Sequence, residues 1–209
     1  IIPYQHFYSV ILYILRTFMS IMTKKAMERF QQYRSKNLAS IGRFLIHCGL
    51  TANIMTFLSL VTGIAAVYFL FEKYYLFLLF AFFHLLADAF DGVLARQTSP
   101  TVSGKWFDFT ADSIVTIFIL LKISWFVSDY FLSILAGLYT LSLIVYATSR
   151  FQAPILFTRT LTIILCALAA PPLLAKTLLP LTIISLSSGV AALYSLTRQL
   201  QWFLQNRHD

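Results

Sequence analysis

The chain has 209 residues, of which 59% are hydrophobic and 11% are charged, and its formal net charge is +8. Soluble globular domains carry about 25% charged residues, so this composition excludes an ordinary water-soluble protein and indicates an integral membrane protein. The basic residues gather in particular connecting segments, which membrane topology explains better than nucleic-acid binding does, so no nucleic-acid partner is expected.

Residues 1–46 are predicted to form an amphipathic, juxtamembrane region ahead of a membrane domain at 47–209. The stretch from Met22 to Arg43 is basic and carries apolar residues at helical spacing. Such a pattern is typical of a helix that lies on the membrane surface. The preceding stretch from Phe7 to Met22 is apolar but short and is interrupted by Arg16, and a seventh span there is the competing interpretation.

The rest of the chain is predicted to cross the membrane as helices. A helix needs about 20 apolar residues to cross the hydrocarbon core. Six segments meet this requirement: Ala52–Tyr74, Tyr75–Leu94, Trp106–Trp125, Tyr130–Tyr146, Leu161–Leu179 and Leu181–Phe203. The predicted fold is therefore an all-α integral membrane protein with six transmembrane helices, preceded by an N-terminal amphipathic interfacial helix.

The loops differ in their content of basic residues from one side of the membrane to the other. One side has Lys24, Lys25, Arg29, Arg34, Lys36, Arg43, Arg96, Lys105, Arg150, Arg159, Arg198 and Arg207; the other has Lys73, Lys122 and Lys176. Loops rich in Lys and Arg stay in the cytoplasm. Both termini, and the connection between the second and third spans, are therefore expected to face the cytoplasm.

Four of the chain's eight acidic residues lie close together around that connection. Asp88 and Asp91 are three residues apart at the end of the second span, and Asp108 and Asp112 are four apart at the start of the third. Each pair shares a helix face. Because the link between these spans is short, the helices are expected to be antiparallel neighbours whose carboxylates lie at the same depth.

Carboxylates in this setting require cations. A carboxylate at mid-bilayer costs about 2.5–3.5 kcal/mol on insertion scales, and mutual repulsion adds to that cost. Arg96 and Lys105 are too few to balance four carboxylates. An all-oxygen ligand set suits Mg²⁺ or Mn²⁺, and magnesium fills its other positions with water and substrate phosphates. The cluster therefore predicts a divalent metal site and a phosphate-bearing substrate.

Small residues accompany the aspartates: Gly92, Ala95 and Gly104. They allow a backbone or a flat ligand to approach the helices closely. The complete pattern is Asp88-x-x-Asp91-Gly92-x-x-Ala95-Arg96, seven further residues, then Gly104-x-x-x-Asp108-x-x-x-Asp112. It resembles the signature of the CDP-alcohol phosphotransferase family. The stretch GLTANIMTFLSL from Gly49 to Leu60 also resembles the family's entry to its first span, with Ala52 in place of the usual proline.

The resemblance implies an enzyme that transfers a phosphatidyl or phosphoalcohol group from a CDP-linked donor to a hydroxyl and releases CMP. It implies two divalent ions held by Asp88, Asp91 and Asp108, with Asp112 completing the second metal site and acting as general base. The implied nucleotide and pyrophosphate residues are Asn53, Thr56, Gly92, Ala95, Arg96 and Gly104. Family members are commonly homodimers.

The acceptor is expected to be a small polar alcohol. The stretch YATSRFQAPILFTRTLTIIL resembles the inositol-phosphate branch, in which basic residues receive the acceptor's phosphate, so Arg150 and Arg159 are candidate acceptor-binding residues. Alternatively, both arginines simply follow the charge bias of cytoplasmic loops. A CDP-diacylglycerol-type donor is favoured. The pair Asp112-Ser113 leaves open the branch that uses CDP-choline or CDP-ethanolamine with diacylglycerol.

Two other classes of membrane protein carry intramembrane carboxylates. Membrane prenyltransferases place two Asp-rich motifs around Mg²⁺, but those motifs lie far apart in sequence. Ion-coupled transporters place carboxylates near mid-bilayer across several helices. Here all four aspartates crowd two helix ends on one side, so both alternatives are disfavoured.

Overall fold

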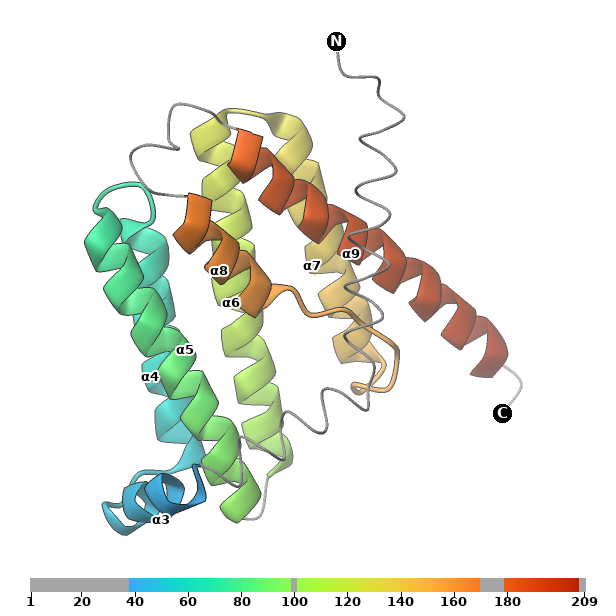
Figure 1. Cartoon of the computed structure of the whole chain (residues 1–209). Coiled ribbons are helices and arrows are strands. Elements are labelled where there is room, and N and C mark those ends of the chain that lie inside the picture. Colours follow the sequence, from blue (N-terminus) through green and yellow to red (C-terminus); the bar gives the residue numbers. More distant parts are fainter. Residues whose placement is uncertain (1–37, 99–100, 170–178, 207–209) are drawn as a thin grey trace.

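The computed structural model describes residues 38–98, 101–169 and 179–206, and this part of the chain is all-helical. Its helices are α3 (Ala39–His47), α4 (Ala52–Phe69), α5 (Tyr74–Gln97), α6 (Val102–Val127), α7 (Tyr130–Thr148), α8 (Arg159–Ala169) and α9 (Leu179–Gln205). The long helices run alternately up and down, with α4 and α5 on one side of α6 and with α7 and α9 on the other (Figure 1). The predicted all-α class is confirmed for the described residues.

Five of the helices are long and apolar enough to cross a membrane: α4, α5, α6, α7 and α9. They correspond to five of the six predicted spans, and they support an integral membrane protein. The predicted span Leu161–Leu179 is represented by the shorter apolar helix α8, which ends at Ala169. Residues 170–178 lie outside the described residues, so the count of six spans stays a prediction.

The predicted N-terminal region also lies mostly outside the described residues, which begin at residue 38. Its described end forms α3, which packs against α5, and Gln97 Nε2 donates a hydrogen bond of 3.2 Å to the carbonyl oxygen of Ala39. α3 leaves Phe44 66% exposed. The interfacial helix proposed for 22–43 therefore stays a prediction.

Side-chain caps fix where three of the helices begin. The Thr51 hydroxyl accepts from the backbone N–H of Ile54 at the start of α4, and the Thr101 hydroxyl accepts from Gly104 at the start of α6. At the opposite end of the bundle, the Asp129 carboxylate accepts from Phe131 at the start of α7. Caps of this kind satisfy backbone donors that the first helical turn leaves unpaired.

Small residues let α4 lie close to both α5 and α6. A Cβ added to Gly63 would lie 2.6 Å from Val115 on α6 and 2.8 Å from the imidazole of His84 on α5. The buried Ser59 on α4 bonds the same imidazole, with 2.9 Å between its Oγ and His84 Nδ1. α4 thereby positions both helices that carry the aspartates.

A second group of contacts joins α7, α9 and the segment before α8. Gln199 Nε2 on α9 donates to the carbonyl oxygen of Ser142 on α7 at 3.0 Å. The backbone N–H of Leu156 donates to Ser195 Oγ on α9, and that of Thr158 donates to Tyr139 Oη on α7. These bonds tie the segment to α7 and α9, and so they fix where α8 begins.

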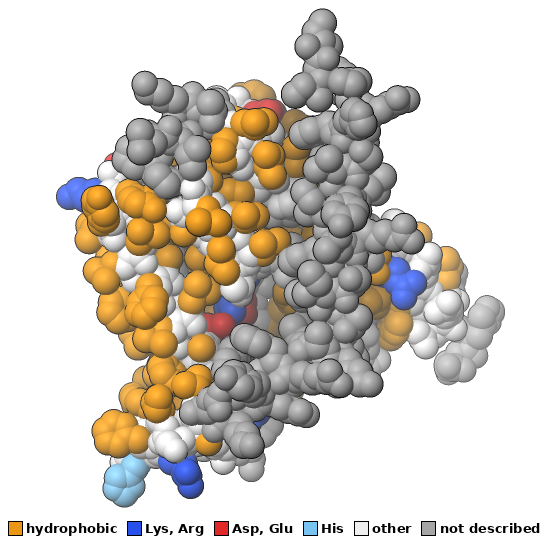
Figure 2. All heavy atoms as spheres, in the orientation of Figure 1, with side chains coloured by type: hydrophobic (Ala, Val, Ile, Leu, Met, Phe, Trp, Pro, Cys, Tyr) orange, Lys and Arg blue, Asp and Glu red, His pale blue; other side chains and the backbone are white. Residues whose placement is uncertain are grey.

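The outer surface of the bundle is largely apolar. Phe82, Ile134 and Leu168 are 60%, 59% and 64% exposed. The space-filling view shows hydrophobic side chains over most of the described face, with acidic and basic atoms together near its middle (Figure 2). Such a surface suits lipid rather than water, and polar groups inside it mark functional positions.

Candidate functional site

The four aspartates lie where the sequence spacing places them, near one end of the bundle. Asp88 and Asp91 lie in the last turns of α5, and Asp108 and Asp112 lie in the first turns of α6. The sequence predicted that these two helices are close neighbours. In the structure, both α5 and α6 pack against α4 much more extensively than against each other. The close approach at Gly63 makes α4 their shared support, and the carboxylates face each other across the space between α5 and α6.

Three of these carboxylates form a compact cluster. Asp88, Asp108 and Asp112 each offer one oxygen, and the three oxygens lie within 4.8 Å of one another. All three residues are partly buried. A small all-oxygen set of this kind is the coordination chemistry that Mg²⁺ and Mn²⁺ prefer, so the residues fit a divalent cation.

Asp91 has a different environment from the other three. It is 5% exposed, and its Oδ2 accepts a hydrogen bond of 3.1 Å from the hydroxyl of Thr56 on α4. The Thr56 hydroxyl also lies 3.1 Å from the carbonyl oxygen of Ala52 in its own helix. Asp91 is therefore oriented by α4, one helical turn from Asp88.

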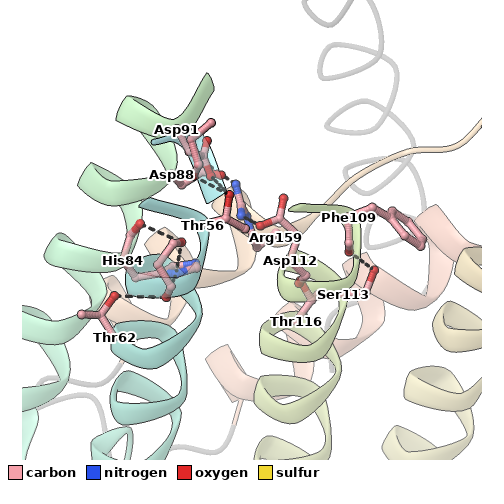
Figure 3. Close-up of polar contacts among 12 residues, drawn as sticks. Thr56, Thr62, His84, Asp88, Asp91, Phe109, Asp112, Ser113, Thr116 and Arg159 are labelled. Carbon is pink, nitrogen blue, oxygen red and sulfur yellow. Dashed lines mark hydrogen bonds and ion pairs between the residues drawn. The ribbon is translucent and has the colours of Figure 1, made fainter. Parts of the chain in front are cut away.

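A basic side chain reaches the cluster from a distant part of the sequence. Arg159, the first residue of α8, forms an ion pair of 2.6 Å with Asp88 Oδ2 and a second ion pair with Asp112 (Figure 3). The side chains of Arg159, Asp88 and Asp112 are 11%, 19% and 26% exposed. The guanidinium therefore joins α5 to α6 within a mostly buried setting.

From the sequence, Arg159 was predicted to bind the acceptor, and its ion pairs with the aspartates were not predicted. One signal was available, because basic side chains within apolar segments pair with carboxylates. His84 lies one helical turn before Asp88 on α5, but its Nδ1 is directed to the hydroxyl and carbonyl oxygens of Ser59 on α4.

A cavity of about 360 Å³ adjoins the aspartates between α4, α5 and α6. Its lining includes seven residues that the sequence singled out: Asn53, Thr56, Asp91, Gly92, Ala95, Gly104 and Asp108. It also includes Lys105 and three threonines, none of which was predicted as a site residue: Thr51, Thr98 and Thr101. The volume lies in the range typical of small-molecule sites.

Glycine keeps part of this cavity open. A Cβ added to Gly104 would lie 3.1 Å from Asn53 Oδ1 and 3.0 Å from the capping hydroxyl of Thr101. Arg96, which was expected in the same pocket, is exposed near the end of α5 and does not line the cavity.

A second, smaller cavity of about 80 Å³ adjoins Asp112. Its lining is Asp112, Ser113, Thr116, Tyr139, Leu143, Phe157, Arg159 and Thr160. Arg150 lines neither cavity: it is exposed just after α7, with a backbone φ of 54°. The two arginines that were predicted to bind the acceptor therefore have different positions, and of the two only Arg159 reaches the aspartates.

The family model of CDP-alcohol phosphatidyltransferases matches residues 49–197. The chain belongs to this family. Comparison with curated proteins gave no match. The match includes all four aspartates, both cavities and Arg159. The family synthesises phospholipids by phosphotransfer and uses divalent metals, which agrees with the Asp88–Asp108–Asp112 cluster.

Proposed function

We propose that this transferase moves a phosphatidyl group from a CDP-diacylglycerol-type lipid to the hydroxyl of a small polar alcohol and releases CMP. The acceptor is proposed to be of the inositol-phosphate or glycerol-phosphate type. One observation carries the proposal: the cluster of Asp88, Asp108 and Asp112 adjoins two cavities, a larger one that Asp108 lines and a smaller one that Asp112 lines. A donor and an acceptor in these two cavities would meet at the carboxylates.

Asp88, Asp91, Asp108 and Asp112 are the proposed ligands of two Mg²⁺ or Mn²⁺ ions. Bound divalent ions would neutralise the pyrophosphate and stabilise the departing CMP. The chain's own contribution is to hold the carboxylates in place. Thr56 orients Asp91 by its hydrogen bond, and the helical spacing of Asp108 and Asp112 aligns both on one face of α6.

The larger cavity is the proposed site for the cytidine and pyrophosphate of the donor. Gly92, Ala95 and Gly104 leave room for a flat base, while Asn53 and Thr56 offer hydrogen-bonding groups. Lys105 adds a positive charge at the same wall. Arg96 is exposed, so its proposed contribution is to attract the anionic donor rather than to contact the buried part of the nucleotide.

The smaller cavity is the proposed acceptor site. Asp112 would accept the proton of the acceptor hydroxyl as that oxygen attacks the donor phosphorus, and the bond from phosphorus to the CMP oxygen would break. Arg159, which lines the same cavity, has the planar donor fork that binds a phosphate dianion. Arg150 lines neither cavity, so it is proposed only as a basic residue of a cytoplasmic loop.

Charge placement supports a cytoplasmic site. Lys73 precedes α5 at one end of the bundle. Four basic residues lie at or near helix ends on the side of the bundle that holds the aspartates: Arg96, Lys105, Arg150 and Arg159. Basic residues mark the cytoplasmic side. We therefore propose that the site and both termini face the cytoplasm. A homodimer is proposed separately, on the resemblance to the family alone.

The proposal is tested by measuring CMP release from purified protein with CDP-diacylglycerol, Mg²⁺ or Mn²⁺, and one acceptor at a time. The panel contains glycerol 3-phosphate, inositol 1-phosphate, inositol, serine and glycerol. Metal-dependent release with one of the phosphorylated acceptors is expected. Turnover only with CDP-choline or CDP-ethanolamine and diacylglycerol would overturn the assigned donor. Absence of CMP from every pair would overturn the proposed reaction.

A further inference from the structure

The guanidinium of Arg159 contacts carboxylates that a bound metal ion would also use. It contacts Asp88 Oδ2 and Asp112, which are two of the three carboxylates in the cluster. Two cations within about 4 Å of each other repel strongly in a partly buried site. The guanidinium in this position and a divalent ion bound to the same oxygens are therefore alternatives.

The backbone around Arg159 is anchored away from the aspartates. Thr158 is bonded through its N–H to Tyr139 on α7, and Leu156 is bonded to Ser195 on α9. The backbone N–H of Thr162 donates to the carbonyl oxygen of Thr158 at 2.8 Å, which continues α8. α8 also packs against α5 away from the aspartates, where Tyr74 Oη donates to the carbonyl oxygen of Ala167. Because these contacts and the bonds to α7 and α9 do not involve the guanidinium, the long side chain of Arg159 can leave the carboxylates without any movement of the helices.

There is also a place for the released side chain. Arg159 lines the small cavity together with Asp112, Ser113 and Thr160. A guanidinium that turns away from Asp88 would enter this space. Its donors would then be available to an anion beside Asp112, because they would no longer be paired with carboxylates.

We propose that Arg159 is a positioning residue that neutralises the acidic cluster before metal binds. A divalent ion then displaces it into the small cavity, where it binds the phosphate of the acceptor. The second half of this inference rests on the proposed function. The exchange makes binding ordered: the metal must bind first, because only then is Arg159 released from the carboxylates to bind the phosphate of the acceptor.

The first test measures Mn²⁺ affinity by calorimetry, without nucleotide or lipid, for wild type, Arg159→Gln and Lys105→Gln. Lys105 is the matched control: it lines the large cavity beside Asp108, and its ammonium lies 4.6 Å from the centre of the Phe151 ring. Removing either charge makes the site more negative. Only Arg159→Gln also removes a competitor for the ligand oxygens.

We expect Arg159→Gln to bind Mn²⁺ about tenfold more tightly or better, and Lys105→Gln to change the affinity by about threefold at most. Arg159→Lys should give an intermediate gain, because one ammonium cannot reproduce the planar fork. Equal or weaker Mn²⁺ binding by Arg159→Gln would overturn the exchange, and so would an equal gain in Lys105→Gln. In EDTA the melting temperature of Arg159→Gln should fall below that of wild type, and Mn²⁺ should restore it.

The second test measures binding of inorganic phosphate with and without Mn²⁺. Wild type should bind phosphate only with Mn²⁺, and Arg159→Gln should bind it much more weakly under the same conditions. Undiminished phosphate binding by Arg159→Gln with Mn²⁺ would show that the metal alone holds the anion and would overturn the second half of the inference. Failure of the proposed reaction is read separately, as absence of CMP release from a wild-type protein that binds Mn²⁺.

Discussion

The hydroxyl of Thr56 donates a hydrogen bond of 3.1 Å to Oδ2 of Asp91, and this bond joins α4 to α5 in the lining of the large cavity. Both side chains are buried, at 3% and 5% exposure. A buried carboxylate without hydrogen-bonding partners is unfavourable, so the orientation of Asp91 depends on α4. The contact therefore links the packing of the bundle to the position of a proposed metal ligand.

Thr56→Val keeps the shape of the side chain but removes its hydroxyl. We expect a loss of about 1–3 kcal/mol in the free energy of unfolding, because the buried carboxylate loses a donor. The KM for the CDP-linked donor should rise as Asp91 loses its fixed orientation. Thermal unfolding and donor titrations measure the two effects. Thr56→Ser retains the hydroxyl and should resemble wild type in both; a Thr56→Val protein with unchanged KM would contradict the assigned role.

Asp112→Asn tests the proposed base, because an amide nitrogen and oxygen cannot take the hydroxyl proton. Turnover should fall by about 100-fold or more, whereas affinity for CMP should stay close to that of wild type. CMP release and CMP titration measure these quantities. Asp129→Asn is the matched control, since Asp129 caps α7 at the far end of the bundle and asparagine also caps helices. Equal loss of turnover and CMP affinity in Asp112→Asn would instead indicate a purely metal-binding role.

Gly104→Ala tests whether the large cavity holds the donor. The added Cβ would press against Asn53 Oδ1 at 3.1 Å and Thr101 Oγ1 at 3.0 Å, and so would narrow the cavity. We expect the KM for the donor to rise by about tenfold, while the KM for the acceptor should change little. Gly137→Ala on α7 is the control, because a Cβ there meets no atom within 4 Å. An unchanged donor KM in Gly104→Ala would place the nucleotide elsewhere.

Removal of divalent metal tests the carboxylate cluster directly. Dialysis against EDTA should abolish CMP release, and Mg²⁺ or Mn²⁺ should restore it. Ca²⁺ should restore little, since it prefers more ligands and longer bonds than three clustered carboxylates supply. The protein should stay helical throughout by circular dichroism, because Arg159 can still neutralise Asp88 and Asp112 by its ion pairs. Full activity in EDTA would contradict the proposed metal role.

Much of the fold was predictable because the signals are local. An apolar run of sufficient length specifies a membrane helix, and five of the six predicted spans are helices of that length and composition. The sixth predicted span, Leu161–Leu179, stays a prediction, because residues 170–178 lie outside the described part of the chain. Helix ends differ from the predicted ones by a few residues, because Thr101 and other capping side chains decide where a helix begins.

The sequence by itself determined which residues share a helix face. Asp88 and Asp91, and likewise Asp108 and Asp112, are aligned by the period of the helix alone. Only the tertiary structure decided what lies opposite them. α4 supports both α5 and α6 through close contacts at Gly63, and α8 delivers Arg159 to Asp88 and Asp112. Contacts between residues so far apart in the chain depend on how whole helices pack, and no local periodicity encodes that packing.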